Sequence, residues 1–177
     1  MFKLLKITIF LLLCVIQISF IPALPSPFFN INIIIIGLVI FLALNNLEDA
    51  LAWGTAAGIL LDVYSFHFFG LYILSLTAML VLTDLFLRKF FTNRSVYSFI
   101  FLNSLALVFF EAARLSLIFL FDFFTKGIFY QDIFSAGYFS SLAYKLIFGI
   151  VIIFISFYSI NYYSKKMKSF FITVAKK

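Results

Sequence analysis

Four ionisable side chains lie inside long apolar stretches of this 177-residue sequence, where a charged group is costly. They are Asp62, Glu111, Arg114 and Lys145. Such residues usually face neighbouring helices or a water-filled cavity, where they pair with one another or contact a ligand. Two interpretations are open: a polar pocket that binds a ligand, or buried salt bridges, such as Asp62 with Arg114 or Lys145, that fix how the helices assemble. Without a companion motif, we favour the structural role.

Residue types that support catalysis are scarce. The segment 111–114, Glu-Ala-Ala-Arg, faintly resembles intramembrane proteases with a glutamate and an arginine on one helix, but those need further histidines. The chain has one histidine, His67, between two apolar segments, and Asp62 and Asp84 lack the Gly-x-Gly-Asp context of intramembrane aspartyl proteases. The single cysteine, Cys14, is far along the chain from that histidine. We therefore expect no enzyme, no bound metal and no cofactor.

The composition is that of an integral membrane protein. Hydrophobic residues make up 65% of the chain and charged residues 11%, whereas a soluble domain is about half apolar and about a quarter charged. A core this small cannot bury so much apolar surface, so lipid must cover the rest. With about 20 residues per membrane-spanning helix, there is room for five or six spans and for no ATPase or nucleotide-binding domain.

The apolar stretches predict six transmembrane helices. Pro22, Pro25 and Pro27 separate the first two, because proline ends a helix and extends the residue before it. A polar turn at residues 45–49 precedes the third helix, and a polar loop at 122–137 precedes the last. The predicted helices cover residues 4–21, 28–44, 50–64, 70–87, 96–121 and 139–162.

Charge predicts the orientation. Six spans place both termini on one side, and the side richer in lysine and arginine is cytoplasmic. The net charge of +6 is spread over short clusters beside apolar runs, which indicates membrane orientation and argues against nucleic-acid binding. The side opposite the termini holds Lys126 alone. The side of the termini holds Lys3, Lys6, Arg88, Lys89, Arg94, Lys165, Lys166, Lys168, Lys176 and Lys177.

The predicted organisation is one polytopic helical domain at residues 1–163 and a basic cytoplasmic tail at 164–177. In the tail, apolar residues recur at i, i+3, i+4 and i+7 among lysines. This spacing suits a short helix on the anionic membrane surface, and a frayed basic tail is an equal alternative.

The orientation places the four intramembrane charges at one depth, in the outer half of the membrane, where they form a charged layer of zero net charge. The layer consists of Asp62, Glu111, Arg114 and Lys145. Gly54, Gly58 and Asp62 are spaced i, i+4, i+8 on one helix face, and such a small-xxx-small pattern lets another backbone approach closely. Replacing Gly58 with leucine is therefore expected to disrupt packing. Asp62→Asn is expected to do less if Asp62 only forms hydrogen bonds.

The segment 53–77 resembles the signature of the rod shape-determining protein MreD family. In that family, a glycine-bearing helix reaches an aspartate, a short turn follows, and a Gly-Leu pair opens the next helix. The close resemblance covers roughly residues 50–95, and the rest of the chain matches in hydropathy. The matching positions are Gly54, Gly58, Asp62, Gly70 and Leu71.

This resemblance implies a non-catalytic scaffold of the bacterial cell-elongation machinery in the plasma (inner) membrane. Its partners would be a bitopic MreC-like protein, the cytoskeletal protein MreB, the glycosyltransferase RodA and a penicillin-binding protein, which together place peptidoglycan synthesis along the side wall. An alternative is the substrate-binding subunit of an energy-coupling factor vitamin transporter, which is similar in size and topology. The charged layer would suit that subunit, but the first helix lacks the Ala-x-x-x-Ala pattern typical of it.

Overall fold

The computed structural model describes residues 2–26, 28–44, 46–65, 67–90, 96–126, 138–155 and 158, and in these ranges the fold is all α-helical. Six principal helices are present in the described ranges. They are α1 (Phe2–Val15), α2 (Ile33–Leu44), α3 (Leu47–Tyr64), α4 (Leu71–Phe90), α5 (Val96–Lys126) and a final helix at Tyr138–Ile155.

Short helical turns connect α1 to α2. The first helix continues into a π-helical turn, η1 (Ile16–Phe20), and a 3-10 turn, η2 (Ile21–Ala23). A further 3-10 turn, η3 (Phe28–Asn30), follows the prolines. The polar residue Gln17 lies within the π-helical turn, a type of irregularity that is frequent at functional sites.

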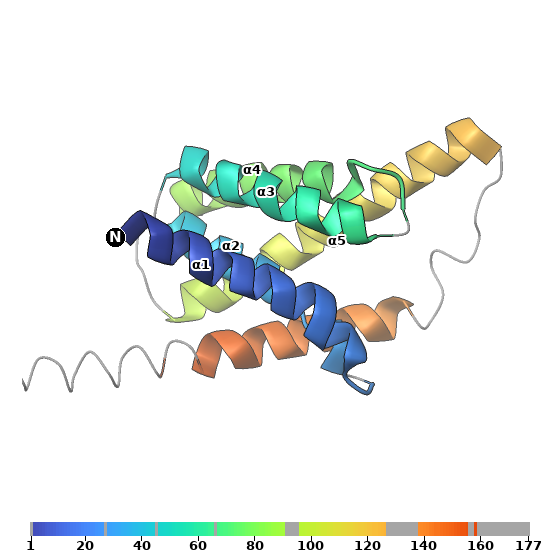
Figure 1. Ribbon diagram of the computed structural model, residues 1–177. Coiled ribbons are helices and arrows are strands. Elements are labelled where there is room, and N and C mark those ends of the chain that lie inside the picture. The colour runs from blue at the N-terminus through green and yellow to red at the C-terminus, as the bar shows by residue number, and fades with distance from the viewer. Residues whose placement is uncertain are drawn as a thin grey trace, which may run out of the picture.

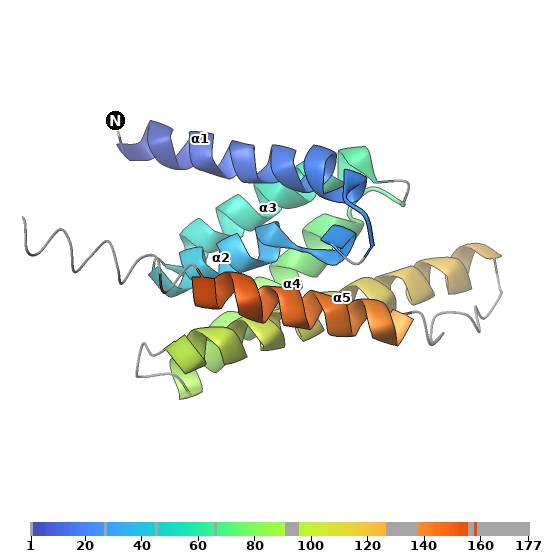
Figure 2. The same ribbon diagram turned by 90° about the horizontal axis from the view of Figure 1, so that it is seen from below.

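The helices run alternately in opposite directions, as Figures 1 and 2 show. The start of α1 and the end of the Tyr138–Ile155 helix consequently lie at the same end of the bundle (Figure 1). Among the helices α1 to α5, the most extensive contacts are those of α4 with α3 and with α5. The later part of α5 extends beyond the other helices at the opposite end (Figure 1).

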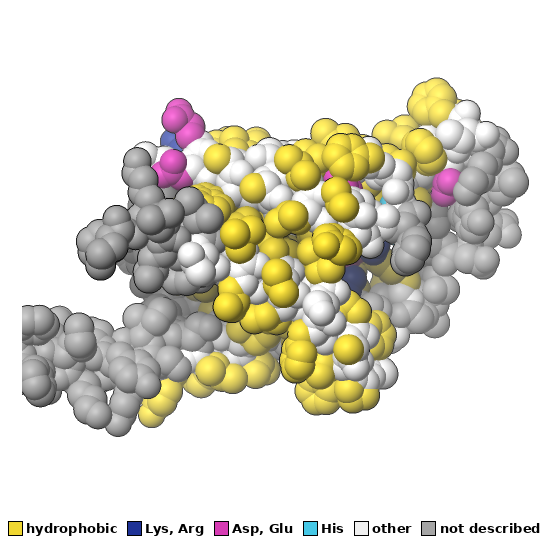
Figure 3. All heavy atoms as spheres, viewed as in Figure 1, with side chains coloured by type: hydrophobic (Ala, Val, Ile, Leu, Met, Phe, Trp, Pro, Cys, Tyr) yellow, Lys and Arg dark blue, Asp and Glu magenta, His cyan; other side chains and the backbone are white. Residues whose placement is uncertain are grey.

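Helix length and composition make this a multi-pass membrane protein. Among the described residues, three helices are long and apolar enough to cross a bilayer: Leu71–Lys89, Ser98–Thr125 and Tyr138–Ile155. Two shorter apolar helical stretches occupy Phe10–Ala23 and Phe28–Ala43. Large apolar side chains also remain exposed over much of the surface in Figure 3, as expected where lipid covers the protein.

The interior combines an apolar core with buried polar groups. On α4, Leu76, Met79 and Leu80 are fully buried and pack in one cluster with residues of α1, α2, α3 and α5. Asp62 and Glu111 are buried as well, at 4% and 2% exposure. Burial of a carboxylate destabilises the fold unless hydrogen bonds replace the lost water, so both Asp62 and Glu111 need such partners.

Several predicted helix bounds were wrong. The second α-helix begins at Ile33, not at residue 28, because the residues after the prolines form a 3-10 turn. The third begins at Leu47 within the predicted 45–49 turn, where Glu48 and Asp49 favour the first helical turn by facing its partially positive end.

The fourth and fifth helices also run further than predicted. The fourth continues to Phe90 because Arg88 and Lys89 favour a last helical turn, whose end is partially negative. The fifth continues to Lys126, five residues into the predicted loop. The tail at 164–177 and the remainder of that loop, residues 127–137, lie outside the described residues.

Candidate functional site

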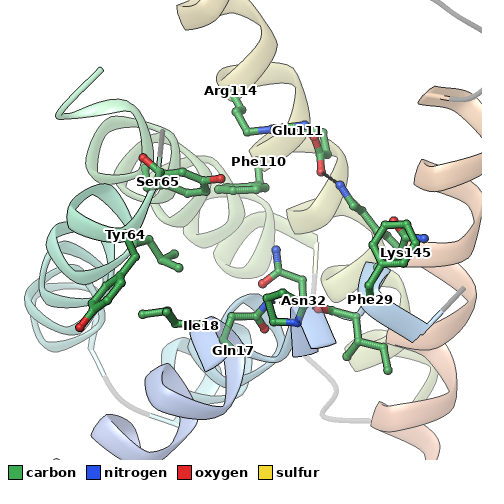
Figure 4. Close-up of a pocket in the computed structure, with 15 residues that line it drawn as sticks. Gln17, Ile18, Phe29, Asn32, Tyr64, Ser65, Phe110, Glu111, Arg114 and Lys145 are labelled. Carbon is green, nitrogen blue, oxygen red and sulfur yellow. Dashed lines mark hydrogen bonds and ion pairs between the residues drawn. The ribbon is translucent and has the colours of Figure 1, made fainter. Parts of the chain in front are cut away.

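Glu111 is the centre of a buried charged cluster (Figure 4). Its Oε1 lies 2.5 Å from Nζ of Lys145. Its Oε2 accepts hydrogen bonds from Nη2 of Arg114 at 2.7 Å, from Nε of Arg114 at 3.1 Å and from the hydroxyl of Tyr138 at 3.3 Å. Both carboxylate oxygens are therefore fully engaged, which compensates for the loss of water around a buried acid.

Local helix geometry and one long-range contact assemble this cluster. Glu111 and Arg114 are three residues apart on α5, which places their side chains on the same face. Lys145 comes from the Tyr138–Ile155 helix and joins it to α5. One turn earlier on that helix, the hydroxyl of Ser141 donates to Oδ1 of Asn30 at 2.7 Å. Polar contacts thus attach the last helix to two parts of the bundle.

Asp62 has different partners from those suggested by the sequence. Its Oδ1 accepts from the backbone N–H of Tyr72 at 2.8 Å, and its Oδ2 accepts from the N–H groups of Gly70 at 3.0 Å and Ile73 at 3.3 Å. These groups belong to the start of α4, whose first N–H groups have no partner within the helix. A carboxylate here satisfies them and faces the positive end of the helix dipole. Asp62 therefore caps α4 from the end of α3.

Two glycines allow the α3–α4 hairpin to close around this cap. A Cβ atom at Gly58 would lie 2.6 Å from Cα of Ile73 and 2.9 Å from its backbone nitrogen, so the helices touch backbone to backbone there. Gly70 has a φ of +103°, a conformation that residues with a side chain rarely adopt. A Cβ atom at Gly54, in contrast, would meet the end of the flexible Leu80 side chain and no backbone atom.

The charged layer of the sequence analysis therefore separates into two parts. Glu111, Arg114 and Lys145 form one hydrogen-bonded cluster, while Asp62 belongs to the helix hairpin. Asp62 pairs with backbone because the turn at Gly70 places the N–H groups at the start of α4 beside the carboxylate at the end of α3.

A cavity of about 290 Å³ lies against the cluster, between the turns that connect α1 to α2 (η1, η2 and η3), the end of α3, the start of α4, α5 and the last helix. Glu111, Arg114 and Lys145 line one wall, with Gln17 and Asn32 across from them (Figure 4). The Arg114 and Lys145 side chains remain 20% and 19% exposed while Glu111 is almost fully buried. The apolar lining comes from Ile18, Pro22, Phe29, Ile31, Leu61 and Phe110.

Two amide side chains that line this cavity, Gln17 and Asn32, were not predicted from the sequence. Gln17 donates from Nε2 to the carbonyl of Ile31 at 3.2 Å and accepts at Oε1 from the N–H of Ile33 at 2.8 Å, so it holds the connection before α2 in place. Asn32 accepts at Oδ1 from the N–H of Ile35 at 3.4 Å, at the start of α2. Gln17 was detectable as an amide inside an uncharged apolar stretch, where polar side chains often bond across helices.

No family model, curated protein or solved structure matches the chain. Within the ranges that the structure describes, no three histidine, cysteine, aspartate or glutamate side chains form a group that could hold a metal ion.

The Glu111 cluster is expected to behave as one unit in unfolding experiments. Glu111→Gln should destabilise the protein by about 3–5 kcal/mol, because it leaves two cations without their buried partner. Lys145→Gln should cost less, since Arg114 still pairs with Glu111. The double substitution should differ from the sum of the single changes by about 1–3 kcal/mol, as residues in one network do. Thermal and denaturant unfolding in detergent micelles measures each value.

Glu48→Gln is a suitable control for this series, because it makes the same substitution as Glu111→Gln at an exposed residue in the first turn of α3. It should change stability by less than about 1 kcal/mol. Strictly additive effects of Glu111→Gln and Lys145→Gln would contradict the cluster as described.

Proposed function

We propose that this chain is a non-catalytic membrane scaffold of the bacterial cell-elongation machinery, of the MreD type, with six spans and both termini in the cytoplasm. The observation that carries the proposal is the α3–α4 hairpin. Three of the five positions on which the family resemblance rests, Gly58, Asp62 and Gly70, close and cap it. These signature residues therefore have a structural role, which suits a protein that functions by binding its partners through helix surfaces.

The surface of the bundle supports a role in assembly. A shallow groove of about 670 Å³ runs along α4 and α5, and its lining is almost entirely apolar. The groove includes the small side chains of Ala78, Ala113 and Ser116. Small residues allow another membrane helix to approach closely, so a face of this kind suits contact with the single span of an MreC-like protein.

Depletion of the protein from the bacterium that makes it tests this function. We expect depleted cells to lose their rod shape and become round, as fluorescent labelling of new peptidoglycan should show along the side wall. Wild type and Gly54→Ala should restore the rod, while Gly58→Leu should not. Cells that remain rod-shaped after complete depletion would contradict the proposal.

The cavity favours a second candidate, the substrate-binding subunit of an energy-coupling factor transporter. Such a subunit needs a pocket for a small molecule, and the cavity beside Glu111, Arg114 and Lys145 has suitable lining. This candidate predicts vitamin uptake that stops on depletion while cell shape is unchanged, the reverse of the result expected for the scaffold.

A further inference from the structure

The cavity beside Glu111 carries an unbalanced positive charge. Its charged lining residues are Glu111, Arg114 and Lys145, one negative and two positive, so their formal charges sum to +1. The other buried acid of this region, Asp62, directs both oxygens to the N–H groups of α4 and is not among the lining residues. A net charge held in an apolar layer is costly unless water or a counter-ion accompanies it.

The two cations also have donors beyond those that Glu111 uses. A guanidinium has five N–H donors and an ammonium three, whereas Glu111 accepts two bonds from Arg114 and one from Lys145. Both cationic side chains are about one-fifth exposed and line the cavity, while the carboxylate is almost fully buried behind them. Both cations therefore lie at the wall of the cavity, with their charged ends beside Glu111 (Figure 4).

We propose that this cavity binds a small amphipathic monoanion, with its carboxylate or phosphodiester group between Arg114 and Lys145. One negative charge brings the cluster to neutrality, and oxyanions accept the strong hydrogen bonds that these cations donate. The site goes beyond the scaffold function, which does not require it. Two sources share this chemistry: the headgroup of an anionic phospholipid and a free organic acid.

The rest of the lining sets the size and character of the ligand. About 290 Å³ is the space of roughly ten water molecules at about 30 Å³ each, which fits a lipid headgroup or a small organic acid. Phe29 and Phe110 provide apolar contact, and Tyr72 also lines the cavity. The nearby amides of Gln17 and Asn32 are engaged at the start of α2, so they shape the wall.

Two arms of one experiment test the site and distinguish the sources. In the first, native mass spectrometry measures binding of phosphatidylglycerol and of zwitterionic phosphatidylcholine to the delipidated full chain. In the second, thermal unfolding in phosphatidylcholine nanodiscs measures stabilisation by dimethyl phosphate and by benzoate. We expect phosphatidylglycerol to bind at least tenfold more tightly than phosphatidylcholine, or benzoate to bind at least tenfold more tightly than its uncharged analogue benzamide. Preference for phosphatidylglycerol in the first arm, with or without stabilisation by dimethyl phosphate, assigns the lipid. Stabilisation by benzoate without that preference assigns a free organic acid.

Three variants connect binding to the cavity. Lys145→Gln makes the cluster neutral and should weaken anion binding about tenfold or more. Ile18→Trp keeps the charges but fills the cavity and should also abolish binding. Arg88→Gln removes a cation from the other end of α4 and should bind as wild type does. If Lys145→Gln does not fold, Ile18→Trp decides, since it leaves the cluster intact.

The proposal is overturned if neither arm shows a preference for the monoanion. It is also overturned if folded Lys145→Gln and Ile18→Trp bind as tightly as wild type, or if Arg88→Gln weakens binding as much as they do, since the anion would then bind the basic surface in general.

Discussion

Gly58→Leu is expected to prevent α3 and α4 from packing and to destabilise the protein by more than about 3 kcal/mol, which is above the usual range of about 1–3 kcal/mol for overpacked cores. The reason is the nature of the atoms that a side chain would meet. A Cβ at Gly58 would lie 2.6 Å from Cα of Ile73, so relief requires a shift of the α4 backbone. Even Gly58→Ala should cost about 2 kcal/mol.

Gly54→Ala is the matched control, since Gly54 lies one turn earlier on the same buried face. Its Cβ would meet only the side chain of Leu80, closest at the terminal Cδ1, and this side chain can change rotamer. We expect a loss below about 1 kcal/mol. Thermal unfolding in detergent, together with the protease-resistant fraction, measures both variants. Equal destabilisation by Gly54→Ala and Gly58→Ala would mean that the backbone contact is not the cause.

Asp62→Asn is the second substitution with a large expected effect, of about 2–4 kcal/mol, because hydrogen bonds to a charged group contribute about 1.5–3 kcal/mol each. The carboxylate accepts three N–H groups with two oxygens, whereas asparagine has one acceptor oxygen and would turn an N–H donor toward the start of α4. The loss of negative charge at the helix N-terminus adds to the cost.

Asp49→Asn is the control for this change, because Asp49 is an exposed aspartate in the first turn of α3. It should cost less than about 1 kcal/mol. Amide hydrogen exchange gives a second readout: in Asp62→Asn, the N–H groups of Gly70, Tyr72 and Ile73 should exchange faster, with little change elsewhere in α4. Unchanged exchange at these three positions would contradict the cap.

The helical class and the approximate positions of the helices could be predicted, because apolar stretch length and proline placement act locally along the chain. The stripe of Gly54, Gly58 and Asp62 could also be predicted to share one face, since it depends only on 3.6 residues per turn. Glu111 and Arg114 were recognisable as neighbours for the same reason. Helix ends were harder, because Glu48 and Arg88 look like boundaries but stabilise terminal turns.

The partners of the charged residues could not be predicted, because they depend on distances between helices. Four charges at one depth allow several pairings. The turn at Gly70 shows why Asp62 meets backbone N–H groups, and the position of the last helix beside α5 shows why Lys145 reaches Glu111. The spacing of Gly54 and Gly58 likewise does not reveal which one touches backbone. Uncharged residues such as Gln17 were overlooked for a related reason: an amide gives a weak signal unless its partner is known.

The central claim is that this chain is a scaffold of the cell-elongation machinery. The most direct test is to purify a tagged full-length copy gently from its native membranes and to identify the accompanying proteins by mass spectrometry. We expect an MreC-like bitopic protein or RodA with wild type and Gly54→Ala, and neither with Gly58→Leu. Recovery of paired ATPases with a membrane coupling subunit would contradict the claim and identify a transporter subunit instead.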